Sequence, residues 1–308
     1  MLLKPFREVF TEESCDVKKS NISAVAQWSN QIFAQKDTLL QRRNWNSRMI
    51  PKDIKRLREF FYRMSAQALP NHCNIIKTIG GEKWLGGCGF LNGEKLVCMD
   101  RLYQDLQENG IQNCLIYSFG VGKVQQNCLN QSFTSFHILF CGLGDEWSFE
   151  TKMAEMGCMV HAYDPTVTLP PNSTHLKFYP MGLGHQDDPE NSKMPILTLQ
   201  TILEQNGDSD KQITYLKLDI EQAEIQVMEQ LISTEIFNQV SQIGIEVHTG
   251  ELESRGQILN GLSSLLKSFY HLHSKGFRLV YYYPNDCMHK SYDSEGIFYN
   301  FFDLLFTK

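Results

Sequence analysis

Two apolar runs of this chain each end in polar residues that can do chemistry. Tyr215–Leu218 is followed at once by Asp219 and Glu221, and a second run, IGIEVH, contains Glu246 and ends in His248. Runs of this kind are typical of buried strands. In an open parallel sheet, ligands bind outside the carboxyl ends of the strands, so both sets of polar residues should face one cleft.

The chemistry of such a cleft has more than one interpretation. Carboxylate oxygens and an imidazole nitrogen can together hold a divalent cation, or His248 can act alone as a general base. The simpler interpretation is that Asp219 caps the following helix, with Glu221 in its first turn. Glu246 would then pair with a lysine or a backbone amide, and His248 would cap a loop. We predict Asp219, Glu221 and His248 as catalytic residues, assign no metal, and interpret Glu224 as a helix-surface acid.

The scaffold for these residues is predicted from residue 114 onward, where strand and helix alternate five times. Strands are expected at 115–120, 159–163, 176–179, 215–218 and 243–248, and helices at 148–156, 197–204, 225–232 and 256–274. Two aromatic strands, 277–283 and 296–302, should close the chain as an antiparallel pair. This pattern predicts an α/β fold with a Rossmann-like, mostly parallel sheet and helices on both faces.

The chain ahead of this domain divides into two further segments. Residues 1–70 carry two amphipathic helical patterns and are predicted to form an N-terminal helical cap. Residues 71–113 are rich in glycine and contain strand candidates at 75–79 and 95–99, which predicts a hairpin-like joining segment or lid. The Rossmann-like domain should then span residues 114–308.

Two glycine turns compete for the place after the first strand of the sheet. One contains Gly120 and Gly122, and the other contains Gly142 and Gly144. A nucleotide-binding sheet needs one such turn, and an acid about 20 residues later that takes the ribose hydroxyls. Asp164 fits that acid, and its spacing favours the second turn.

Only one glycine turn remains after the first strand if Lys123–Gly144 is an insertion. Removing it leaves YSFGVGDEWSFE, which gives the first turn the same spacing to Asp164. The segment differs in composition from its surroundings and repeats its own junction. We therefore predict that residues 123–144 are an insertion such as translated intron, with a genuine surface loop as the alternative; sequencing the spliced transcript distinguishes the two.

Charge and hydropathy exclude several functions. The chain has 308 residues, a formal net charge of −6 and a pI near 5.9. Binding along a nucleic-acid backbone needs a basic surface, so it is disfavoured. No apolar run approaches about 18 residues, which predicts no transmembrane segment. The N-terminus lacks the uninterrupted apolar core of a signal peptide.

The nine cysteines show no zinc-type spacing, and buried free thiols are the default interpretation. Cys88 and Cys98 flank a glycine-rich turn and are the favoured disulfide if the chain is secreted. Asn21, Asn130 and Asn172 each begin an N-x-S/T sequon. Chance can produce this number of sequons, so they leave the compartment open.

Four stretches of the chain resemble one known family. With the interruption set aside, FGVGDEWSFE, HAYDPT, YLKLDIEQAE and IGIEVH are similar, in this order, to motifs of FkbM-type S-adenosylmethionine-dependent methyltransferases. The resemblance covers roughly residues 71 to 308. Its most specific part is the D-x-E-G-x-E pattern, in which Gln222 replaces the glycine.

The resemblance implies a cofactor and roles for individual residues. S-adenosyl-L-methionine would be the methyl donor, with O-methyl transfer as the reaction. Gly120 and Gly122, or Gly142 and Gly144, would line the methionine end of the donor. Asp164 would hold its ribose, and Asp219 would lie near the reacting centre with Glu221 beside it. The family also suggests the secretory pathway.

The acceptor cannot be identified from the sequence. A small molecule or a glycan is favoured over nucleic acid because the chain is acidic. One alternative is a catalytically inactive methyltransferase-fold binding protein, which an interrupted cofactor turn would favour. A nicotinamide-dependent dehydrogenase is a further alternative, although no G-x-G-x-x-G is present.

Overall fold

The computed structural model describes the chain from His72 to its last residue, with gaps. The described residues are 72–83, 91–121, 123–124, 144–167, 170–190, 194–221, 223–248, 255–284, 290–293, 296–299 and 301–308. The predicted N-terminal cap and most of the predicted insertion lie outside them. The chain divides into two compact units at residue 44, and everything below concerns the second unit.

The centre of the fold is a seven-stranded sheet with the order β14-β17-β13-β12-β5-β8-β9. Its strands are β5 (Leu115–Phe119), β8 (Met159–Tyr163), β9 (Leu176–Tyr179), β12 (Ile213–Leu218), β13 (Val240–His248), β14 (Arg278–Pro284) and β17 (Phe301–Thr307). The pairs joining β9, β8, β5, β12 and β13 are parallel, whereas β17 is antiparallel to both of its neighbours. The predicted mostly parallel sheet with an antiparallel C-terminal pair is confirmed.

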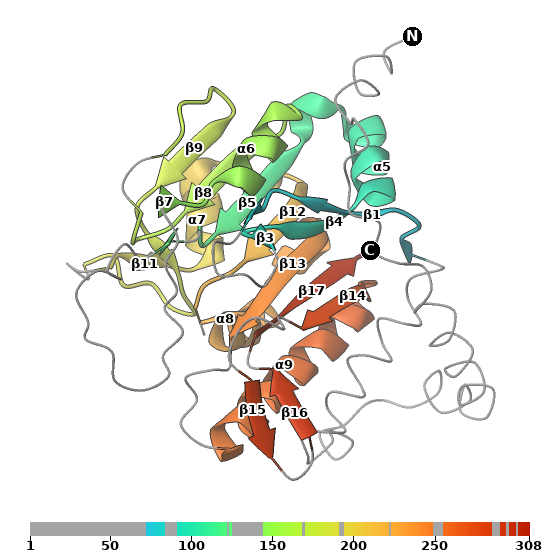
Figure 1. Ribbon diagram of the computed structural model, residues 1–308. Helices are drawn as coiled ribbons and strands as arrows, with labels where there is room; N and C mark the ends of the chain where they lie inside the picture. Colours follow the sequence, from blue (N-terminus) through green and yellow to red (C-terminus); the bar gives the residue numbers. More distant parts are fainter. Residues whose placement is uncertain are drawn as a thin grey trace. The chain divides into compact units, whose positions relative to one another are not determined.

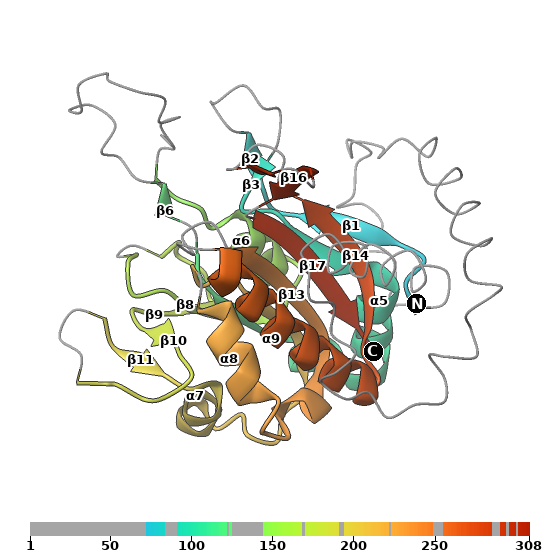
Figure 2. The same cartoon turned by 90° about the horizontal axis from the view of Figure 1, so that it is seen from below.

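Helices cover both faces of this sheet (Figures 1 and 2). One face carries α7 (Leu199–Asn206), α8 (Glu224–Leu231) and α9 (Arg255–Ser274), whose buried leucines, isoleucines and phenylalanines form one cluster with apolar strand residues. The other face carries α5 (Met99–Asn109) and α6 (Ser148–Glu155). Burial on both faces explains why the central strands read as continuous apolar runs.

A small antiparallel pair precedes the first strand of the sheet. It consists of β1 (Ile76–Ile79) and β4 (Lys95–Cys98), in which Ile76 lies opposite Cys98 and Ile79 opposite Lys95. The two predicted strands of the joining segment therefore pair. Helix α5 follows β4 without a break and was not predicted. Its N-cap residue is Cys98, which makes no side-chain capping bond, so the usual signal for a helix start is missing.

The end of the chain differs from the predicted strand 296–302. Residues Gly296–Tyr299 form β16, which pairs with β15 (Lys290–Asp293) in a separate ribbon, and the strand that enters the main sheet is β17. Three further two-stranded ribbons are β2 (Glu82–Lys83) with β3 (Leu91–Asn92), β6 (Lys123–Val124) with β7 (Gly144–Asp145), and β10 (Gly182–Leu183) with β11 (Ile196–Leu197). No described helix is long and apolar enough to cross a membrane.

The part of the chain that the structure describes contains two disulfides, and neither is the predicted pair. Cys98 pairs with Cys73, not with Cys88, and Cys114 pairs with Cys158. The Cα atoms of the two pairs are 5.8 and 4.6 Å apart, within the range that a disulfide can bridge. The prediction of free thiols is thus wrong for these four residues. Spacing along the chain does not reveal which cysteines meet, because the pairing depends on how β1, β4, β5 and β8 are arranged.

Candidate active site

The first turn of the sheet is formed at Gly120, directly after β5. Gly120 has φ +81°, and a Cβ atom on it would lie 1.6 Å from the backbone oxygen of Asp219. Gly120 N donates to the backbone oxygen of Tyr163, and Asp219 N donates to that of Phe119. Glycine is therefore required here both for its backbone conformation and for the close approach of the chain after β12.

Asp164 fixes this turn from the end of β8. Its side chain is buried and accepts hydrogen bonds from the backbone N of Val121, at 2.9 Å, and from the backbone N and the hydroxyl of Thr166. The structure thus brings together Asp164 and the Gly120 turn. A carboxylate can accept about four hydrogen bonds, and the described residues supply three of them to Asp164.

The second candidate turn does not follow a described strand of the main sheet. Gly144 lies in β7, where it is opposite Val124, and Asp145 is opposite Lys123. Gly122 and Gly142 lie outside the described residues, as does the strand predicted before Gly142. The two ends of the predicted insertion therefore lie side by side.

A buried ion pair contacts the backbone of the Gly120 turn. Lys217 of β12 donates to the backbone oxygen of Gly120 and pairs with Glu150 of α6 at 3.1 Å. The Ser118 hydroxyl donates to the same Glu150 oxygen at 2.5 Å. This arrangement explains the last acid of the DEWSFE stretch, because Glu150 neutralises a lysine in the middle of the sheet.

Asp219 does not cap the helix that follows it. Helix α8 begins at Glu224, its N-cap residue is Ala223, and that cap makes no side-chain bond. Glu221 lies ahead of the helix with φ +51°, the one non-glycine residue with positive φ among the described residues. Its side chain is 82% exposed. The simpler interpretation, in which Asp219 caps the helix and Glu221 lies in its first turn, is therefore wrong.

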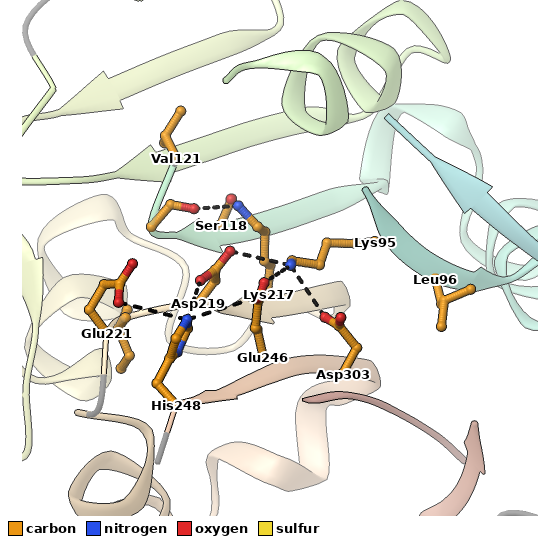
Figure 3. Close-up of polar contacts among 12 residues, drawn as sticks. Lys95, Leu96, Ser118, Val121, Lys217, Asp219, Glu221, Glu246, His248 and Asp303 are labelled. Atoms are coloured by element: carbon orange, nitrogen blue, oxygen red, sulfur yellow. Dashed lines mark hydrogen bonds and ion pairs between the residues drawn. The ribbon is translucent and has the colours of Figure 1, made fainter. Parts of the chain in front are cut away.

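Lys95 is the centre of the charged cluster (Figure 3). Its Nζ lies 2.5 Å from Glu246, 3.3 Å from Asp219 and 3.3 Å from Asp303. The lysine side chain is 3% exposed. Asp303 is directly opposite Glu246 in the β13–β17 pairing, so both carboxylates lie on the same face of the sheet. Glu246 thus pairs with a lysine, as its simpler interpretation predicted.

Three contacts hold Lys95 in this position. The Gln242 side chain accepts from the backbone N of Cys98 at 2.9 Å and donates to its backbone O at 3.1 Å. Tyr215 donates to the backbone O of Leu96 at 2.8 Å. The Cys73–Cys98 disulfide fixes the end of the same strand. The tyrosine fits because Gly244, two residues after its partner Gln242 in β13, has no side chain; a Cβ there would lie 1.9 Å from the tyrosine hydroxyl.

His248 is held by Glu224, which corrects the prediction of a surface acid. Glu224 is fully buried, and its Oε1 lies 2.9 Å from His248 Nδ1 and accepts from the backbone N of Ile220. The Nε2 atom of His248 points toward the acids, at 3.8 Å from Asp219, 3.7 Å from Glu221 and 3.8 Å from Glu246. The structure therefore brings Asp219, Glu221 and His248 together as predicted.

These charges shift several pKa values. Burial favours neutral groups, but the hydrogen bond to Glu224 and the nearby carboxylates raise the pKa of His248 to about 10. Burial likewise opposes the ionised form of Asp219, yet Lys95, Lys217 and His248 lower its pKa to about 2. At neutral pH His248 is an imidazolium and Asp219 a carboxylate.

The pKa of Asp303 shifts in the opposite direction to that of Asp219. Burial and the charges of Glu246 and Asp219 raise its pKa to about 7, although Lys95 opposes the change. Within the cluster the pKa of Asp219 is therefore lowered and that of Asp303 is raised.

The ligand-type atoms of Asp219, Glu246 and His248 lie within 4.8 Å of one another. A divalent cation here would have to displace the Lys95 ammonium from both carboxylates and the proton from His248. Burial alone would lower the pKa of Lys95, but Asp219, Asp303 and Glu246 hold it well above its ordinary value. The lysine therefore stays charged and supplies the positive charge of the site. We assign no metal.

Sequence reasoning missed Lys95, Asp303 and the role of Glu224. For Glu224 a signal was present, because it begins the buried helical stripe that continues through Val227, Met228 and Leu231. Lys95 and Asp303 reach the site through long-range pairing, which local patterns do not contain.

Comparison with known proteins covers the middle of the chain. A family model described as the methyltransferase FkbM domain matches residues 101–279, more than half of the sequence. Probable methyltransferase-like protein 24 of Homo sapiens is 27% identical over 201 residues, which cover 61% of this chain and 48% of that protein. The protein of the same name in Rattus norvegicus is 27% identical over 202 residues, covering 62% and 48%. The matched part spans about half the length of these relatives. Lys95 and Asp303 lie outside the family match.

Proposed function

Since this chain belongs to the FkbM methyltransferase family, we propose that it transfers the methyl group of S-adenosyl-L-methionine to an oxygen atom of a small-molecule or glycan acceptor. The observation that carries the proposal is the junction of Gly120, Asp164 and Asp219 at the carboxyl ends of three adjacent parallel strands. In open α/β sheets this edge is where ligands bind. The family match removes the support for a dehydrogenase.

The residues present fit the donor. Asp164 lies at the carboxyl end of β8, where an acid would take the ribose hydroxyls, and its side chain contacts the turn after β5 through the backbone N of Val121. When bound, S-adenosylmethionine supplies an electrophilic methyl group. The ionised Asp219 next to this turn favours positive charge near the reacting centre.

The proton of a hydroxyl acceptor needs a base. Methyl transfer to oxygen forms an O–C bond while the hydroxyl loses its proton, and the ideal base has a pKa near the working pH. His248 is already protonated, and Asp219 is too weak a base at a pKa of about 2. Asp303 has a pKa of about 7 and lies on the other side of Lys95. We therefore assign proton acceptance to Asp303, with His248 and Asp219 as positioning residues.

The charge state of Asp303 can be tested without knowing the acceptor. Its pKa is raised above the ordinary 3.8, so its contribution to stability is fully present below about pH 4 and is lost as the pH rises through about 7. We expect Asp303→Asn to remove this loss and to raise the free energy of unfolding at pH 8 by about 1–3 kcal/mol relative to wild type. Urea denaturation at pH 5 and pH 8 measures it.

Asp210→Asn is the matched control, because Asp210 is exposed in the turn after α7. It should shift stability equally at both pH values, by no more than about 0.5 kcal/mol. A parallel pH profile for Asp303→Asn and wild type would show that Asp303 does not titrate in this range, and would remove it as the proton acceptor.

Donor binding tests the proposed function itself. Calorimetric titration with S-adenosylhomocysteine should be performed on the full chain and on a chain lacking residues 123–144. The deletion can be closed because Lys123 and Asp145 lie opposite each other. We expect the shortened chain to bind and Asp164→Ala in that background to bind at least 10-fold more weakly, since it removes both the turn contact and the ribose acceptor.

The outcomes separate the two candidate functions. Binding by the shortened chain alone would support donor-dependent methyl transfer and the insertion together. Binding by both chains would make residues 123–144 a tolerated loop. Binding by neither, with both folded, would overturn the methyl-transfer proposal and favour a catalytically inactive methyltransferase-fold binding protein, the second candidate, which rests on the interrupted turn.

A further inference from the structure

Asn172 begins a sequon whose position in the fold is favourable for modification. The sequence Asn172-Ser173-Thr174 fits the N-x-S/T pattern with no proline at its second position. Asn172 is exposed and lies outside regular secondary structure, in the connection between β8 and β9. The other two sequon asparagines, Asn21 and Asn130, lie outside the described residues. An N-linked glycan needs an exposed asparagine of this kind.

A second, independent observation concerns the compartment in which the chain folds. All four cysteines in the described part of the chain are paired, as Cys73–Cys98 and Cys114–Cys158. Structural disulfides form in the endoplasmic reticulum and outside the cell, and are rare in the reducing cytosol. The endoplasmic reticulum is also where N-x-S/T sequons are glycosylated.

The position of the sequon leaves the candidate active site open. The backbone O of His175 accepts from the N of Val160, near the start of β8. Asn172 therefore lies close to the amino ends of the strands, whereas Gly120, Asp164 and Asp219 lie at their carboxyl ends. A glycan at Asn172 would not stand over the site.

The same position gives the glycan a physical role. β9 is the last strand at one end of the main sheet, and in the described residues it pairs with β8 alone. An open strand edge presents unpaired backbone groups that can pair with another chain, and proteins cover or charge such edges. A bulky, hydrated glycan a few residues before β9 would block that approach.

We propose that Asn172 carries an N-linked glycan, attached in the same oxidising compartment in which Cys73–Cys98 and Cys114–Cys158 form. The chemical class of the modification is an oligosaccharide on the side-chain amide. The proposal does not depend on the methyl-transfer function, so either can fail without the other.

The test uses the full chain behind an appended, cleavable secretion signal in cultured animal cells. Asn21→Gln and Asn130→Gln are introduced first, so that any glycan reports Asn172. Cells and medium are pooled, so that retained and exported chains are both included. Samples with and without peptide N-glycosidase treatment are then compared on gels. We expect one glycosidase-sensitive band, lost completely in both Asn172→Gln and Thr174→Ala. Ser173→Ala is the matched control, because it changes the same loop and preserves the sequon, and it should keep the band.

Mass spectrometry after thiol alkylation of the same samples tests the link to the disulfides. We expect Cys114 and Cys158 to be protected from alkylation in the chain that carries the secretion signal, and modified after denaturation in a chain made without it. A chain with both disulfides formed but no glycosidase-sensitive band would overturn the proposal. Free cysteines in a glycosylated chain would overturn the shared compartment.

Discussion

Lys95→Met should lower the free energy of unfolding at pH 8 by about 3–5 kcal/mol, because removing one partner of a buried charge cluster leaves the others uncompensated. Lys95 is 3% exposed and lies within 3.3 Å of three carboxylates, those of Asp219, Glu246 and Asp303. Methionine is unbranched and only one atom shorter than lysine, so it fills most of the same space and the loss mainly reports the missing charge.

The effect of Lys95→Met should depend on pH. Without the lysine, repulsion raises the carboxylate pKa values in the folded state above those of the unfolded chain. Stability in the variant is then highest at low pH and falls as the carboxylates ionise. The loss at pH 5 should therefore be smaller than at pH 8. Urea denaturation at the two pH values measures both quantities.

The control for this variant is Lys152→Met. Lys152 is exposed on α6, and its replacement removes the same charge from the surface. We expect a change within about 0.5 kcal/mol at either pH. If Lys95→Met were as mild as this control, Lys95 would not be the cation that balances the cluster, and a metal ion between Asp219, Glu246 and His248 would become the better model.

Replacing Cys114 and Cys158 together with serine should cost about 4 kcal/mol, because the disulfide closes a loop of 44 residues and restricts the unfolded chain. The bond joins the starts of β5 and β8, two neighbouring parallel strands of the main sheet. The Cys73–Cys98 pair closes a shorter loop of 25 residues and should cost about 3.5 kcal/mol when replaced.

Denaturation with and without reductant tests this prediction. Dithiothreitol should lower the stability of the native chain more than it lowers the stability of either double variant, because each variant has already lost one of the two described disulfides. Equal stability of the native chain and the Cys114→Ser/Cys158→Ser variant in the absence of reductant would contradict the assignment of the disulfide.

Much of the sheet could be predicted from sequence because its strands are local patterns. β5, β8, β12 and β13 are short apolar runs that end in glycine or in polar residues, and their lengths distinguish them from helices. Parallel strands with polar carboxyl ends also predicted that Asp219, Glu246 and His248 would meet. Helix α5 was not predicted, because it follows a strand directly and no side chain caps its first turn.

The remainder of the site depends on contacts between distant parts of the chain. Asp303 enters the cluster because β17 pairs with β13 in one particular register, and a shift by one residue would turn its side chain to the other face. Lys95 enters because β4 is fixed against β13 by Gln242. Neither register nor docking leaves a periodic signal in the sequence. The disulfides are equally invisible, since their pairing follows from the fold.

The double hydrogen bond between Gln242 and the backbone of Cys98 has a dynamic consequence. It makes β4 part of the same cooperative unfolding unit as the central sheet, although β4 is not one of the sheet's strands. The Cys98 amide should then exchange with solvent deuterium as slowly as the amides of β12 and β13. Moving β4 away from the sheet by local fluctuation would require opening the core, so we expect Lys95, which is 3% exposed, to become fully hydrated only in the globally unfolded chain.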